Sequence, residues 1–123
     1  MLTVYKPENH GFDKFISNDD FLCAFITSHS QYSFGRIKLI KRHNESDEVY
    51  ILLKGNARVV TTVNLDGGFT FTDLEPQVAY VVENGTWHYL AVSEDAIVFV
   101  AENSRVSAEN TDTKNIFDLN ITV

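Results

Sequence analysis

Two histidines and a carboxylate are the residues most able to do chemistry together. His43 and Glu48 lie in the string KRHNESDEVYILLKG, around the start of an apolar run that ends at Gly55. His88 lies in ENGTWHYLAV, again between a turn signal and an alternating apolar run. Two imidazoles and a carboxylate brought together inside a barrel would form a site for a small molecule. These residues indicate a small-molecule site, but they do not identify its substrate.

Composition limits the classes of function. The chain has 123 residues, 44% of them hydrophobic, which fits one domain with its own core. It carries 17 acidic and 10 basic residues, a formal net charge of −7, and no long block of positive charge. We therefore expect no non-specific binding to nucleic acid or to an anionic membrane surface. The N-terminal sequence shows no signal segment and no apolar run could span a membrane, so we expect a cytoplasmic protein.

Short strands separated by turns must position the candidate residues. Gly55-Asn56, Asp66-Gly67 and Asn84-Gly85 are tight-turn signals. Val4 and Tyr5 could add a short strand near the N-terminus. The main predicted strands cover residues 21–27, 34–41, 48–54, 57–63, 69–72, 78–82, 87–92 and 96–101. The chain is therefore predicted to be all-β, with about eight to ten strands at the spacing of a sandwich or barrel.

Alternation predicts which side chains share a face. In the strand over 34–41, Ile37 should lie on the face of Lys41 and, where the strand continues, of His43. In the strand over 48–54, Glu48 should share its face with Tyr50. The only cysteine lies in the apolar string FLCAFI at position 23, and we interpret it as a small buried hydrophobe rather than a nucleophile.

The chain divides into three parts. Residues 1–33 are interpreted as N-terminal strands that pack on a barrel, 34–113 as the barrel core, and 114–123 as a C-terminal tail or edge strand. The polar stretch that begins at Glu102, ENSRVSAENTDTKN, is interpreted as a loop over the domain. The final apolar residues are either a docked edge strand or a segment that pairs with another subunit.

The spacing of the candidate residues resembles the first motif of the cupin superfamily. That motif is His, any residue, His, three or four residues, Glu, six residues and Gly. His43, Glu48 and Gly55 match its second His, its Glu and its Gly, whereas Lys41 stands in the place of the first His.

The second cupin motif is also partly present. It is centred on Pro, any residue, Gly, two residues and His, and Gly85 and His88 match it. Glu83 replaces the proline, and Val92 stands where an asparagine is expected. The resemblance covers roughly residues 34–113 and implies a single-domain cupin-type β-barrel, also described as a double-stranded β-helix or jelly roll.

The resemblance implies a metal site in the barrel lumen. His43, Glu48 and His88 would supply two nitrogens and one oxygen to a divalent metal, which could be Fe, Mn, Ni or Zn. Such a set leaves positions open for water, oxygen or substrate. Three outcomes are open for Lys41: it turns to solvent, it becomes neutral with a lowered pKa, or it replaces the metal and pairs with Glu48.

The resemblance supports several functions because cupins serve many reactions. Our leading hypothesis is a cupin whose barrel lumen binds a small polar metabolite together with a divalent metal. If the protein is an enzyme, we expect first a metal-dependent isomerase or epimerase of a sugar-like or carbonyl metabolite, and next an oxygen-dependent dioxygenase. The alternative is a metal-free module that binds or senses an anionic small molecule. Small cupins commonly form dimers, so we also expect a homodimer. The candidate catalytic residues are Lys41, Glu48, Tyr50 and His88. Tyr50 is as well suited to the core as to substrate contact, and Trp87 should point away from His88 and pack.

Overall fold

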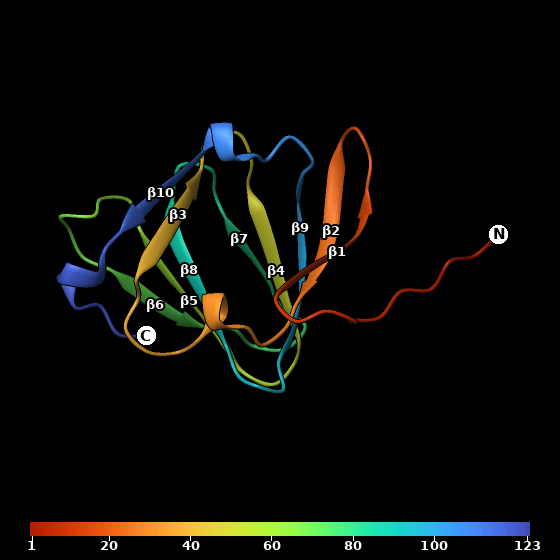
Figure 1. The fold of residues 1–123 in the computed structure, drawn as a ribbon, viewed down its shortest axis with the longest axis horizontal. Coiled ribbons are helices and arrows are strands. Elements are labelled where there is room, and N and C mark those ends of the chain that lie inside the picture. The colour runs from red at the N-terminus through yellow and green to blue at the C-terminus, as the bar shows by residue number, and fades with distance from the viewer.

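Two antiparallel sheets of five strands face each other across a shared apolar core (Figure 1). They are seen in a computed structural model that describes residues 1–123. One sheet has the order β1-β2-β9-β4-β7 and the other β10-β3-β8-β5-β6. The strands are β1 (Phe12–Ser17), β2 (Phe21–Ile26), β3 (Leu39–His43), β4 (Glu48–Lys54), β5 (Ala57–Thr62), β6 (Thr70–Asp73), β7 (Ala79–Val82), β8 (Trp87–Val92), β9 (Ile97–Asn103) and β10 (Thr111–Asn115). The prediction of an all-β chain is confirmed.

The helical content is confined to three short 3-10 helices. They are η1 (Ser30–Tyr32), η2 (Ala108–Asn110) and η3 (Phe117–Leu119). None of the helices has the length and apolar character needed to cross a bilayer.

From β3 onward the chain passes from one sheet to the other at nearly every connection. β4, β7 and β9 belong to one sheet, whereas β3, β5, β6, β8 and β10 belong to the other. This alternation is the jelly-roll pattern. Because β3 runs antiparallel to β8, and β4 antiparallel to β9, the ends of β3 and β9 meet the beginnings of β8 and β4 at one end of the barrel.

The turn signals lie where the sequence predicts them. Gly55 joins β4 to β5 with a φ of +76°, and Gly85 precedes β8 with a φ of +80°. A Cβ atom on Gly55 would also lie 2.7 Å from the Cα atom of Ala96. Glycine is thus required at position 55 by both backbone conformation and space.

Alternate residues of each strand fill the core between the sheets. In β4, Glu48, Tyr50 and Leu52 are buried, as the alternation predicts. A second, smaller cluster lies on the outer face of the other sheet and contains Ile37, Ile40, Val60, Trp87 and Ile116. Trp87 therefore packs on the face opposite to His88, as expected.

Four local predictions are wrong. Residues 4 and 5 form no strand, and β3 begins only at Leu39, so Ile37 lies outside the strand and packs in the outer cluster. Thr111–Asn115 is not a loop but strand β10, which pairs with β3. Cys23 is half-buried rather than buried, because it points to the outer face of its sheet. The final residues dock on their own chain, where Thr122 bridges Arg36.

Candidate metal centre

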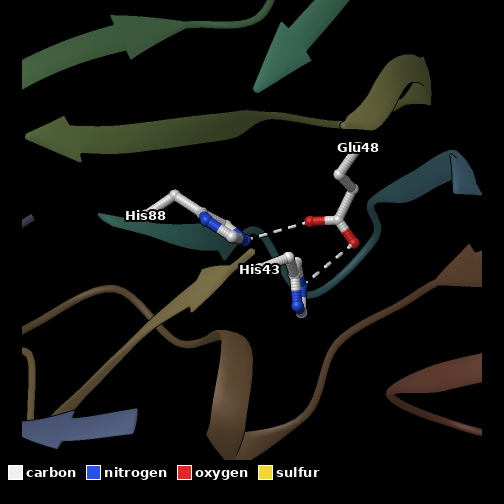
Figure 2. A group of neighbouring side chains, drawn as sticks. All are labelled: His43, Glu48 and His88. Carbon is white, nitrogen blue, oxygen red and sulfur yellow. Dashed lines mark ion pairs between the residues drawn. The ribbon is translucent and has the colours of Figure 1, made fainter. Parts of the chain in front are cut away.

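Three of the predicted residues meet at one end of the barrel. His43 is the last residue of β3, Glu48 is the first of β4, and His88 is the second of β8. Their side chains turn toward one another (Figure 2). The Nε2 atom of His88 lies 3.1 Å from Oε1 of Glu48, and the Nε2 atom of His43 lies 4.0 Å from Oε2. One potential ligand atom from each residue lies within 4.8 Å of the others.

Hydrogen bonds on the far side of each imidazole fix its orientation. Nδ1 of His88 donates to the carbonyl oxygen of Thr86 at 3.1 Å, and Nδ1 of His43 lies 2.9 Å from the hydroxyl of Thr111. Both Nε2 atoms therefore face the Glu48 carboxylate. The same arrangement orients histidine ligands in metalloproteins, where the remote nitrogen bonds to a carbonyl, carboxylate or water.

The surroundings shift the pKa values of the two imidazoles in opposite directions. Burial favours the neutral form of His43 and holds its pKa below the ordinary value. Burial also acts to lower the pKa of His88, but the hydrogen bond to Glu48 and its negative charge outweigh burial and raise it. The neutral form of His43, which can offer a nitrogen lone pair to a metal, is thus favoured, whereas Glu48 favours the protonated form of His88.

Glu48 is held as a carboxylate by its neighbours. Burial acts to raise its pKa, but hydrogen bonds from His88 and Tyr50 lower the net value. The Tyr50 hydroxyl donates to Oε1 of Glu48 from the interior of the barrel. Tyr50 is 3% exposed and belongs to the larger core cluster. It therefore packs in the core and also donates a hydrogen bond to Glu48.

Lys41 lies at the rim of this group. It is directly opposite His88 across the β3–β8 pair, and it is exposed. It takes part in none of the ion pairs of the structure, so it does not pair with Glu48. Its charge nevertheless acts to lower the pKa of His43 and of His88. The exposed position of Lys41 corresponds to the first of the three outcomes considered, in which its side chain turns to solvent.

A second buried carboxyl group, absent from the predicted set, adjoins the first. Glu102 in β9 is directly opposite Glu48 in β4, and its Oε2 atom lies 4.0 Å from Nε2 of His43. Burial, together with the hydrogen bond to Glu48 and its negative charge, raises the pKa of Glu102. The sequence contained a usable signal, since Val98, Val100 and Glu102 alternate along one face of β9.

Tyr32 is the other residue that the sequence did not reveal. It lies at the end of η1 and packs against the main core cluster. Burial and the nearby charges of Glu48 and Glu102 raise its pKa, so the phenol keeps its proton. Nothing in the polar string SHSQYS predicts that Tyr32 packs against the core, because η1 is placed there by the tertiary fold.

A ligand would bind at the mouth of the barrel. Below the group, the space between the sheets is filled by the core cluster, including Tyr50, Leu52 and Val98. Two shallow surface hollows, one beside residues 94–97 and one beside 92–94, lie at the far ends of β8 and β9.

The donor set fits a divalent metal. Two oriented imidazole nitrogens and a carboxylate oxygen, all buried or nearly so, form the common facial set of three ligands. The group His43, Glu48 and His88 could therefore hold a metal ion.

Comparison with known proteins identifies the fold. The sequence matches no model of a known protein family and no protein of curated function. Among solved structures, BH2720 from Bacillus halodurans superimposes with a TM-score of 0.66 at 12% identity, over 81% of this chain and 74% of that one. A cupin-2 domain containing protein from Shewanella frigidimarina gives a TM-score of 0.59 at 16% identity, over 78% of this chain and 83% of that one. This chain has the cupin fold.

The cupin barrel expected from the motif spacing is thus confirmed. A third similar structure is QdtA, a sugar 3,4-ketoisomerase from Thermoanaerobacterium thermosaccharolyticum solved in complex with TDP. It superimposes on this chain with a TM-score of 0.59 at 15% identity, over 80% of this chain and 71% of that one. At these identities the likeness concerns the fold.

Proposed function

We propose that this cupin holds a divalent metal at His43, Glu48 and His88 and acts on a small polar metabolite at the mouth of the barrel. The orientation of the two imidazoles carries the proposal. Each uses Nδ1 for a hydrogen bond that fixes the ring and turns Nε2 toward the carboxylate. This leaves the metal-binding nitrogen of both rings directed at one point.

The proposed reaction is isomerisation or epimerisation of a sugar-like or carbonyl compound. A divalent metal at this position would polarise the carbonyl oxygen of the substrate. Lys41, exposed at the rim, can bind an anionic group of the substrate. The shared fold with a sugar 3,4-ketoisomerase supports this class of reaction by analogy.

The first test is the metal content of protein purified without a metal-affinity tag. We expect near-stoichiometric Fe, Mn, Ni or Zn in the native chain and its loss in His88→Ala. His10→Ala, at an exposed position, is the matched control and should keep its metal. Full metal occupancy in His88→Ala would contradict the proposal.

A metal-free module that binds an anionic molecule is the second candidate. The observation that favours it is the direct opposition of two basic residues at the mouth, Lys41 and His88, the second of which has a raised pKa. Thermal-shift measurements with anionic metabolites, with and without a chelator, separate the two candidates. Only the metal site predicts that a chelator lowers the melting temperature.

We further infer that the chain forms a homodimer through the outer face of the β1-β2-β9-β4-β7 sheet. Two rows of uncharged residues cross that face: Phe25, Phe99 and Ile51 in one, and Cys23, Ala101 and Val49 in the other. Apolar patches of this kind mark interaction surfaces. Because the chain has a net charge of −7, these uncharged rows are where a second copy can approach with little repulsion.

Light scattering tests the dimer. Val81 lies beside Val49 on the same face and is 55% exposed, so Val81→Lys should shift the protein toward the monomer. Val63→Lys changes an 84% exposed residue outside the strands and should leave the dimer intact. A native chain that is monomeric at all concentrations would refute the inference.

A further inference from the structure

We propose that Glu102 is a fourth ligand of the metal centre, which takes over the role of the motif histidine that this chain replaces with Lys41. The proposal rests on the metal site proposed above. It changes the donor set to two imidazoles and two carboxylates.

The register of the sheet brings Glu102 to the site. Glu48 and Glu102 are directly opposed in the β4–β9 pair, and directly opposed residues of antiparallel strands place their side chains on the same face. That face is the inner one, since Val98 and Val100 precede Glu102 in alternation and are fully buried. Glu102 therefore points into the same end of the barrel as Glu48.

The Glu102 carboxyl group lacks a full set of partners. Its side chain is 5% exposed, and Oε2 is buried without any hydrogen-bond partner. Leaving a buried polar atom unpaired costs about 1–3 kcal/mol, so such atoms in native proteins call for an explanation. A bound cation explains this one, because it would give Oε2 a partner that the protein itself does not supply.

The distances suit a shared ion. Oε2 of Glu102 lies 4.0 Å from Nε2 of His43, the same separation as that between His43 and Oε2 of Glu48. Two ligand atoms at about 2.1 Å from one metal are about 3–4 Å apart, so small side-chain movements are enough to close the shell. Glu102 is not within the tight three-residue group and would have to move toward the ion when it binds.

Lys41 explains why a fourth donor is needed from another strand. A protonated lysine has no lone pair to offer a metal, and Lys41 is exposed at the rim. β3 therefore supplies one ligand instead of two, and β9 supplies the missing one. Two carboxylates also balance the charge of a divalent ion, which reduces its repulsion with the Lys41 ammonium.

The added oxygen ligand changes the expected metal. Carboxylate ligands suit Mn²⁺, whereas imidazoles suit Zn²⁺, Ni²⁺ and Fe²⁺. A site with two imidazoles and two carboxylates should therefore favour Mn²⁺ or Fe²⁺ more than a site with three histidines and one carboxylate does. The probe for the test is therefore Mn²⁺ alone.

The test compares Mn²⁺ affinity, measured by calorimetry and by electron paramagnetic resonance of free Mn²⁺, in the native chain and its variants. Glu102→Gln should weaken binding at least tenfold, and Glu102→Asp should weaken it less because it keeps a carboxylate. Glu94→Gln, in the exposed β8–β9 turn, should bind as the native chain does. The double variant Lys41→His with Glu102→Gln should regain affinity, because it restores the motif histidine.

The outcomes separate this inference from the metal site itself. A native chain that binds no Mn²⁺, Fe²⁺, Ni²⁺ or Zn²⁺ overturns both. Loss of binding in His88→Ala with native affinity in Glu102→Gln and Glu102→Asp overturns only the fourth ligand. A Glu102→Gln defect that Lys41→His fails to reduce also overturns it, since Glu102 would then not replace the histidine. Circular dichroism and urea unfolding without metal establish that each variant is folded.

Discussion

The buried carboxyl pair predicts how the stability of the metal-free protein depends on pH. In the fold, the pKa of Glu102 lies above its ordinary value of 4.5, because of burial and because Glu48 is an adjacent carboxylate. An unfolded Glu102 ionises near its ordinary pKa, so folding takes up a proton above that pH. The stability that this group contributes is therefore fully present below pH 4.5 and is lost as the pH rises.

The magnitude follows from the single proton. One proton bound only by the folded state changes the free energy of unfolding by up to about 1.4 kcal/mol per pH unit. Between about pH 5.5 and pH 7.5, Glu102 should thus remove up to about 2.7 kcal/mol of stability. Glu102→Gln is neutral throughout and can still donate a hydrogen bond to Glu48, so this loss should vanish in the variant.

Urea unfolding at several pH values, with a chelator present, measures the effect. The free energy of the native chain should fall relative to that of Glu102→Gln as the pH rises, so that the variant is the more stable at pH 7.5. Glu94→Gln removes an exposed charge and should follow the native curve. Equal slopes for the native chain and Glu102→Gln would refute the reasoning, because Glu102 would then be ionised in the fold and would share no proton with Glu48.

Three further predictions concern stability near neutral pH, each measured by urea unfolding. Tyr50→Phe leaves a buried carboxylate without its hydroxyl donor and should cost about 1–3 kcal/mol, whereas an unchanged stability would show that water replaces the hydroxyl. Leu52→Ala should cost about 2–5 kcal/mol because Leu52 is 2% exposed, and Leu53→Ala, at a position 52% exposed, should cost far less; similar losses would contradict the assigned faces of β4. Gly55→Ala should cost at least about 1 kcal/mol because of its positive φ, while Gly68→Ala, with open space around it, should be nearly neutral.

Local patterns were enough to predict most of the strands. β4 and β8 have the predicted limits, because their alternation is bounded by clear turn residues. The failures lie where local signals are weak. β10 is a polar edge strand without apolar alternation, and it forms because β3 offers it a free edge. Ile37 alternates in phase with Lys41, but it precedes β3 and packs with Ile40 on the other face of the sheet.

The sequence by itself determined the alternating strands, the turn glycines and the spacing that brings His43, Glu48 and His88 to strand ends. These features depend on residues within a few positions of one another. Only the tertiary structure decided that Glu102 lies opposite Glu48, that Thr111 orients His43, and that Lys41 stays exposed. Those contacts depend on which strands become neighbours when the two sheets close. Strand pairing between distant segments is set by burial of the whole core, and no local pattern encodes it.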